Sequence, residues 1–147
     1  WRTLFAPSYA PPAQAPTEGV ARGEYLTDHV SICGDCHTPR DALGAPDSSM
    51  YLAGTNDGPL GNVPNITPDA KTGIGDWDQT DRIALLQDGM LPDFDNVQGK
   101  MADVVDGIAG GPGYFEAPEE DLAAIAAYLA TVPPIAHDVE DDEASPR

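Results

Sequence analysis

Both cysteines of the chain fall within five residues, in the run Cys33-Gly34-Asp35-Cys36-His37. A disulfide between Cys33 and Cys36 would close a very short loop, and the stabilisation that a disulfide provides falls as the closed loop shortens. A chain with two cysteines would ordinarily suggest one structural disulfide, but this bond would contribute little to the fold. The close pair therefore indicates a chemical role, which limits what the rest of the chain can fold around.

The run has the form C-x-x-C-H, the attachment pattern of a c-type haem. In that chemistry each cysteine sulfur adds to one of two porphyrin vinyl groups, and a two-residue spacer lets one turn of chain reach both. The next residue lies under the ring, where it can ligate the iron. We predict thioether bonds at Cys33 and Cys36, an iron ligand at His37, and one covalent haem c. The other ring N–H of His37 should bond to a backbone carbonyl, for which we name Pro46.

Two other chemistries use a C-x-x-C pair. A redox-active dithiol normally opens a helix that follows a strand, and the sequence shows no alternation of strands and helices. A structural zinc site needs four ligands, which His29 and His137 would have to complete. Zinc would leave the Gly- and Pro-rich segment after the motif unexplained, and His137 lies in an acidic tail. The haem interpretation accounts for more of the chain.

The sixth iron ligand decides whether a haem transfers electrons or binds small molecules. A methionine thioether raises the potential and suits electron transfer, a second histidine lowers it, and an open position permits gas chemistry. The methionines are Met50, Met90 and Met101, and any of them could equally be ordinary core filling. His29 lies on the helix that leads into the motif, hence on the proximal side. Position in the sequence alone leaves Met90 and Met101 as equal candidates.

The chain is strongly acidic, since 25 Asp and Glu against 7 Lys and Arg give a formal net charge of −18. Nucleic-acid binding needs clustered Lys and Arg, and an anionic membrane surface would repel this chain, so we predict neither partner. A partner protein with a basic docking surface is the electrostatic complement. Acidity that serves solubility or adapts the chain to high salt is the competing explanation, and having only Lys71 and Lys100 as lysines fits both.

Composition divides the chain into three predicted parts. Residues 1–16 hold four prolines and are typical of an extended arm or linker. Residues 17–136 carry the motif and the helical patterns, and form the predicted cytochrome c domain. Residues 137–147 contain five acids and almost no apolar side chains, which predicts a disordered tail.

No run of about 18 apolar residues occurs, so we predict no membrane span, and the chain does not begin with a secretory signal. It starts with Trp1 and Arg2 ahead of the Pro-rich arm. Such a start is what one expects just after a membrane anchor or a cleaved leader, so a lost N-terminal anchor is one interpretation.

The chain has 15 glycines and 15 prolines, which favours short helices and long loops. A first helix is predicted over residues 17–32, with Thr17 as its N-cap. Residues 38–76 are rich in Gly, Pro, Asn, Asp and Thr and are predicted to form a long ordered loop. A loop of that length is usually functional or held by a cofactor.

Three further helices are predicted. One is capped by Thr80 and ends at Gly89, a second covers residues 98–105, and the last begins at Pro118. The last has three acids in its first turn, where the helix dipole favours negative charge. Its apolar residues recur at i, i+3, i+4 and i+7 and form one predicted buried stripe: Leu122, Ile125, Ala126 and Leu129.

Four runs of this chain resemble class I c-type cytochromes, especially the bacterial ones that occur as small soluble proteins or as cytochrome subunits of periplasmic dehydrogenases. These runs are CGDCHTPRDALG (33–44), NITPDAKTGIGDW (65–77), GMLPDFDNVQGKM (89–101) and EEDLAAIAAYLATVPP (119–134). The resemblance covers residues 19–134. It implies an all-α, cytochrome c-like fold, with short helices and long loops wrapped around one covalent haem.

The resemblance also assigns roles that the residues alone leave open. It makes Met101 the distal iron ligand and places Trp77 near a haem propionate. It further implies that the first helix crosses the last, at these four residues: Gly23, Leu26, Ile125 and Leu129.

The predicted function is outer-sphere transfer of single electrons between redox partner proteins, such as a dehydrogenase donor and an oxidase acceptor. No catalytic residue is expected, so the chain is not predicted to be an enzyme. One alternative is a haem c subunit fixed within a periplasmic dehydrogenase complex, and another is a five-coordinate haem protein that reacts with gas or peroxide. Because thioether attachment follows export, the predicted location is the periplasm or the outer face of the cytoplasmic membrane.

Overall fold

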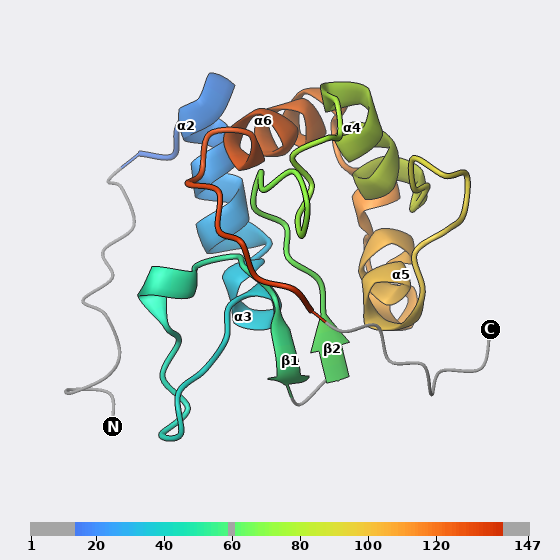
Figure 1. Ribbon diagram of the computed structural model, residues 1–147. Coiled ribbons are helices and arrows are strands. Elements are labelled where there is room, and N and C mark those ends of the chain that lie inside the picture. The colour runs from blue at the N-terminus through green and yellow to red at the C-terminus, as the bar shows by residue number, and fades with distance from the viewer. Residues whose placement is uncertain (1–13, 59–60, 140–147) are drawn as a thin grey trace.

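The computed structural model describes residues 14–58 and 61–139, so most of the Pro-rich arm and most of the acidic tail lie outside the described residues. The described chain is mostly helical and carries one small two-stranded sheet (Figure 1). It is compatible with a cytochrome c-like fold. The all-α prediction was wrong in one respect, because it did not include the sheet. The three predicted parts of the chain stay predictions.

The α-helices are α2 (Gly19–Tyr25), α3 (Gly34–His37), α4 (Gln79–Asp88), α5 (Gly99–Asp106) and α6 (Glu119–Leu129). A π-helical turn, η1, covers Leu26–Val30, and 3-10 turns cover η2 (Ser48–Met50), η3 (Ile108–Gly110) and η4 (Tyr114–Glu116). Strands β1 (Thr55–Gly58) and β2 (Gly61–Val63) pair antiparallel. Within the described ranges no helix has both the length and the apolar character to cross a membrane.

Helices α2 and α6, from opposite ends of the described chain, cross at close range (Figure 1). A Cβ atom added to Gly23 would lie 1.9 Å from the carbonyl oxygen of Ala124 and 2.8 Å from the Cβ of Tyr128. Any side chain at this position would therefore force the two helices apart. The predicted crossing of the first and last helices is confirmed, with Gly23 at its closest point.

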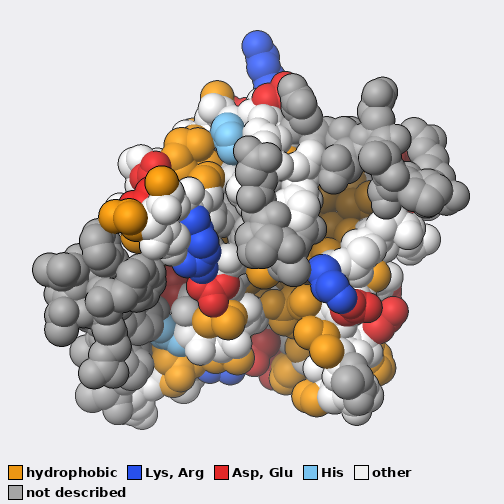
Figure 2. All heavy atoms as spheres, turned by 90° about the horizontal axis from the view of Figure 1, so that it is seen from below, with side chains coloured by type: hydrophobic (Ala, Val, Ile, Leu, Met, Phe, Trp, Pro, Cys, Tyr) orange, Lys and Arg blue, Asp and Glu red, His pale blue; other side chains and the backbone are white. Residues whose placement is uncertain are grey.

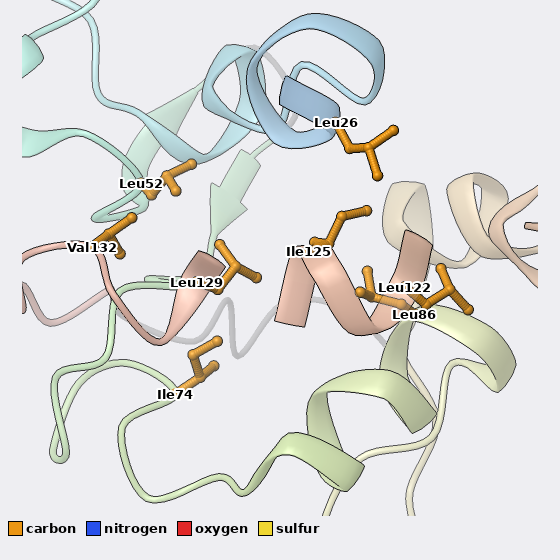
Figure 3. Packing of buried hydrophobic residues seen from close by; sticks show 8 residues of the cluster. All are labelled: Leu26, Leu52, Ile74, Leu86, Leu122, Ile125, Leu129 and Val132. Carbon is orange, nitrogen blue, oxygen red and sulfur yellow. The ribbon is translucent and has the colours of Figure 1, made fainter. Parts of the chain in front are cut away.

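The core is built where α6 meets the other elements. Its buried cluster consists of Leu26, Leu52, Ile74, Leu86, Leu122, Ile125, Leu129 and Val132 (Figure 3). Leu122 on α6 packs beside Leu86 on α4, and Leu52 reaches the cluster from the long loop. The predicted stripe on the last helix is confirmed, because all four of its residues are buried.

Helix α4 begins earlier than the sequence indicated. Asp78 is the N-cap: its carboxylate accepts a hydrogen bond from the Asp81 N–H, and the Asp81 carboxylate accepts one from the Asp78 N–H, both at 2.9 Å. The predicted cap at Thr80 was therefore wrong, because this reciprocal pair of carboxylates satisfies two backbone donors at once. Gly89 ends α4 in the left-handed conformation, at φ 70°, as predicted.

The first helix is shorter and less regular than predicted. Its N-cap is Glu18 rather than Thr17, and no side chain caps it. After α2 the helix widens into the π-turn η1, which ends with a 2.8 Å bond from the Ser31 N–H to the Leu26 carbonyl. Ile32 then adopts a positive φ of 46°, which turns the chain out of the helix. The attachment motif thus follows on a separate helical turn.

The long loop is ordered, as predicted, but it contains the hairpin β1–β2. The sequences of the strands, TNDG and GNV, lack the alternation of apolar and polar residues that predicts a strand. Polar side chains hold the rest of the loop. Asp69 accepts a 2.8 Å bond from the Thr72 N–H, and Asn65 accepts a 2.9 Å bond from the Thr67 N–H.

The start of the tail is bound to this loop. The His137 N–H donates to the Thr72 hydroxyl at 3.0 Å, and His137 Nδ1 lies 2.8 Å from the Ala53 carbonyl oxygen. The Asn65 side-chain amide also donates to the Ile135 carbonyl at 2.8 Å. The first residues after Ala136 are thus bound to the loop, while residues 140–147 lie outside the described chain, so the disordered tail stays a prediction.

An ion pair closes the contact between α2 and α6. The Arg22 guanidinium donates to both carboxylate oxygens of Asp121, each at 2.8 Å. These hydrogen bonds hold the pKa of the Asp121 carboxyl below its ordinary value, and the positive charge of Arg22 adds to the effect, while partial burial opposes it. The bidentate geometry makes this pair stronger than an ordinary surface ion pair.

Replacing Gly23 by Ala should destabilise the fold, because the added methyl group collides with the Ala124 backbone. We expect a loss of about 3 kcal/mol in the free energy of unfolding, measured by urea denaturation. Ala21→Ser adds one heavy atom on the exposed side of the same helix, and should change stability by less than about 0.5 kcal/mol. Equal stability of Gly23→Ala and wild type would show that the helices do not meet as described.

Replacing Asp121 by Asn should cost about 1 kcal/mol of stability at pH 7. The folded-state pKa of Asp121 lies below its unfolded value, so its contribution is present above about pH 4 and is lost as the pH falls through the folded pKa. The difference between Asp121→Asn and wild type should therefore shrink below about pH 4.

The matched control is Asp103→Asn, which removes the carboxylate of the exposed Lys100–Asp103 pair. In urea denaturation, the free energy of unfolding of this variant should match that of wild type within about 0.5 kcal/mol, both at pH 7 and below about pH 4. Equal losses in the two variants would contradict a special role for the Arg22–Asp121 pair.

Candidate functional site: a haem attachment turn

The attachment motif forms one compact helical turn. The His37 N–H donates to the Cys33 carbonyl at 2.9 Å, and the Cys36 N–H approaches the same oxygen at 3.2 Å. Cys33 and Cys36, at positions i and i+3, thus lie on one side of the turn. Both are free thiols, Cys33 partly buried and Cys36 exposed. The structure therefore presents two sulfurs and an imidazole from a single turn, as thioether attachment requires.

His37 has the backbone partner that a ligating histidine needs. Its Nδ1 lies 2.8 Å from the carbonyl oxygen of Pro64, so the Nδ1–H donates there and Nε2 keeps a free lone pair. Burial lowers the pKa of His37, and the bond to Pro64 partly opposes this, so the neutral, ligating form is favoured. The predicted partner Pro46 was wrong: it pairs with Arg40 instead, and the end of strand β2 brings Pro64 to the ring.

Cys33 faces the interior. It packs against the core cluster, and burial raises the pKa of its thiol to about 11, although a hydrogen bond with the Tyr114 hydroxyl opposes the rise. Tyr114, on η4, therefore connects the attachment turn to the segment before α6. Nothing in the sequence around Tyr114 marked it, because its contact with Cys33 joins residues far apart in the chain.

A cavity of about 540 Å³ lies behind η1, and its lining reaches Ser31 but includes neither Cys33 nor Cys36. Its walls come from η1, from the stretch between α5 and η4, and from α6, and are mostly apolar; they include Leu26, Val104, Ile108, Tyr114 and Ile125. Its volume falls in the range of cofactor sites. Figure 2 shows hydrophobic side chains gathered in a recess at the centre of the lower face.

The two candidate distal ligands occupy different environments. Met101, in the first turn of α5, is partly buried and packs against the core cluster. Met90, just after α4, is 39% exposed, and its backbone pairs with Asn96. Neither residue lines the cavity, and His37 does not line it either. The described structure thus brings Met101, but not Met90, to the same core as Cys33.

Trp77 precedes α4 and packs, partly buried, against the core cluster. Its backbone N–H donates to the Ile74 carbonyl at 3.2 Å, and this bond shapes the turn before α4.

A polar contact that sequence reasoning missed joins the loop to η1, where the Tyr51 hydroxyl donates to the Asp28 carboxylate. Burial, followed by that hydrogen bond, raises the pKa of Tyr51, so its hydroxyl stays protonated.

The zinc alternative finds no support in the geometry. Within the described residues no group of three or more His, Cys, Asp and Glu side chains lies close enough together to hold a metal ion. His137, one of the two histidines that would have completed the site, instead bonds to the loop at Ala53. The two free thiols and the oriented imidazole on one helical turn fit a covalently attached haem.

Comparison with known proteins also indicates a haem c protein, although no family model matches the chain. It is 46% identical, over 78% of its length, to a diheme cytochrome c-type protein of Cereibacter sphaeroides. It is 36% identical, over 92%, to the cytochrome c subunit of a quinone alcohol dehydrogenase of Gluconobacter oxydans. It is 38% identical, over 76%, to the fructose dehydrogenase cytochrome subunit of Gluconobacter japonicus.

The attachment turn and these similarities define a protein of the haem c class. The chain belongs to the c-type cytochromes and is related to cytochrome subunits of dehydrogenases, so the predicted resemblance is confirmed. The chain spans only 36%, 29% and 22% of the length of the three relatives, respectively.

Proposed function

We propose that this chain carries single electrons on one covalently bound haem c and catalyses no reaction itself. The observation that carries the proposal is the attachment turn, where Cys33, Cys36 and His37 follow one another and the Nδ1 of His37 is held 2.8 Å from a carbonyl oxygen. The haem supplies an iron that alternates between two oxidation states. Electron transfer needs no further group of the chain to react, in line with the absence of a predicted catalytic residue.

The protein's own residues set the properties of such a haem. The Pro64 carbonyl orients the imidazole of His37 and makes Nε2 a stronger donor. Met101 is the proposed distal ligand, supported by its position against the core, and a thioether there would raise the potential. Trp77 is proposed to lie near a propionate. Cys36 is exposed, so the attached group would meet solvent on that side, where a redox partner can approach.

The relatives suggest a second arrangement, in which the haem c unit is part of a larger complex. Two of them are cytochrome subunits of an alcohol dehydrogenase and a fructose dehydrogenase, and one is a diheme protein. The chain corresponds to about a third or less of each of these. We therefore keep the proposal of a haem c unit fixed within a dehydrogenase complex, which shares the electron-transfer step but not free diffusion. Co-purification with a catalytic subunit would favour it.

The third alternative is a five-coordinate haem that reacts with gas or peroxide. It requires that no side chain ligate the iron opposite His37. A low-spin, six-coordinate spectrum of the reduced protein would exclude it, whereas ready binding of carbon monoxide at neutral pH would overturn the proposed electron-transfer function.

We place the working protein in the periplasm or on the outer face of the cytoplasmic membrane. The support is chemical, because thioether attachment at Cys33 and Cys36 takes place after export. Immunodetection in the periplasmic and membrane fractions of the source cells would test this location, and recovery of the haem-bearing form from the cytoplasm alone would contradict it.

Replacing Met101 by Ala should remove sulfur ligation and lower the reduction potential, because a thioether ligand stabilises the reduced iron. The near-infrared absorption of sulfur-ligated ferric haem and a redox titration measure the two effects. The matched control is Met90→Ala, which should change neither, because Met90 is the exposed candidate. Loss of the sulfur ligand in Met90→Ala alone would reverse the assignment.

The charge of −18 should steer a basic partner toward the chain. The rate of electron transfer to a basic redox protein should fall about tenfold or more between 10 and 300 mM salt, since the Debye length is about 10 Å at 0.1 M. An acidic redox protein of similar potential is the control, and its rate should rise as salt screens the repulsion. A rate with the basic protein that is independent of salt would assign the acidity to solubility or environment.

A further inference from the structure

The segment between α4 and α5 carries a phenylalanine in an exposed and strained position. Phe94 is 85% exposed, the highest value among the large apolar side chains that the described chain exposes. Its backbone adopts a positive φ of 68°, a conformation that is unfavourable for a residue with a bulky side chain. Backbone strain of this kind concentrates at functional sites, so Phe94 is a candidate for binding.

A second turn of the same geometry shows that the fold does not need this phenylalanine. In the Phe94 turn (residues 90–96) and in the Gly44 turn (residues 40–46), the first residue pairs with the seventh. In each, the second residue donates to the carbonyl of the sixth, and the fifth donates to the carbonyl of the second, at 2.8 to 2.9 Å. The fifth residue has a positive φ in both turns. Glycine adopts this conformation without strain, so the geometry of the turn does not explain the aromatic ring.

Hydrogen bonds hold the Phe94 turn in one shape. The Asp93 carboxylate accepts a bond from the Asp95 N–H at 3.1 Å, and the Asp95 carboxylate accepts one from the Asn96 N–H at 2.8 Å. Met90, the first residue of the turn, is 39% exposed, so a second apolar side chain of the same turn meets solvent. An exposed aromatic ring on a preformed turn loses little entropy on binding, which favours its use as an interface anchor.

The charges beside the ring indicate which partner fits it. Asp93 and Asp95 are exposed and flank Phe94, and residues 83–99 contain no Lys or Arg. An anionic lipid surface would repel these carboxylates, and so would a second copy of this chain, which carries the same charge of −18. A protein surface that offers an apolar pocket between Lys and Arg side chains complements both the ring and the carboxylates.

We propose that the Phe94 turn anchors a partner protein, with the ring of Phe94 inserted into an apolar pocket that is rimmed by Lys and Arg side chains. Docking buries a ring that the described chain leaves exposed, and this burial favours the complex. The segment that contains the turn runs along the outer edge of the molecule, between α4 and α5 (Figure 1). Docking at this turn goes beyond the proposed electron transfer and does not depend on it.

The first experiment introduces the substitution Phe94→p-benzoylphenylalanine in the source cells, followed by irradiation and mass spectrometry of the linked peptides. The photo-reactive ring should link to another protein, within an apolar pocket that has Lys or Arg side chains at its rim. The control is the same substitution at Leu43, an exposed residue of the Gly44 turn, which should not link to that pocket. A link to lipid, a link to a second copy of this chain, or no link would each overturn the proposal.

The second experiment measures the affinity of the purified protein for the linked partner by isothermal titration calorimetry. Phe94→Gly should weaken binding about tenfold or more, whereas Leu43→Ser should leave it unchanged. The thermal stability of Phe94→Gly should match or exceed that of wild type, because glycine relieves the strain. A ring with only a structural role predicts lower stability and unchanged affinity, and unchanged affinity would overturn the proposal. Absence of covalent haem from wild type would instead refute the proposed function and leave this comparison intact.

Discussion

The close contact between Gly23 and α6 is the constraint on which the rest of the structure depends. Because Gly23 has no side chain, α2 rests directly on the backbone at Ala124, and the Arg22–Asp121 pair holds the two helices together. This contact joins the two ends of the described domain. It places η1, which leads into the attachment turn, along one wall of the apolar cavity. A bulkier residue at one position would therefore disturb both the core and the site.

The loop between the attachment turn and α4 supplies contacts to the site and to the core that the helices do not make. It is held mainly by polar side chains, as when Asn65 bonds both within the loop and to the Ile135 carbonyl. Its hairpin delivers the Pro64 carbonyl to His37, while Leu52 joins the core. The same loop contains Ile74, whose carbonyl accepts a hydrogen bond from Arg82. An ordered loop of this kind lets a small domain orient a large cofactor with few regular elements.

Sequence patterns predicted the elements whose formation depends on residues close together in the chain. The last helix was predicted correctly because one continuous stretch of sequence contains both its apolar stripe and its acidic first turn. The hairpin was missed because its short strands carry no apolar alternation, and their pairing depends on the surrounding loop. The cap of α4 was misplaced because Thr80 and Asp78 are both good capping residues, and only the reciprocal bonds with Asp81 distinguish them.

The sequence by itself determined the chemistry of attachment, because Cys33, Cys36 and His37 lie within five residues and one helical turn brings them together whatever the rest of the fold. It also determined the net charge of −18. Tertiary structure alone decided that Pro64, and not Pro46, orients the imidazole, and that Tyr114 meets Cys33. These contacts join residues far apart in the chain, and such pairs meet only when the loop and helices pack.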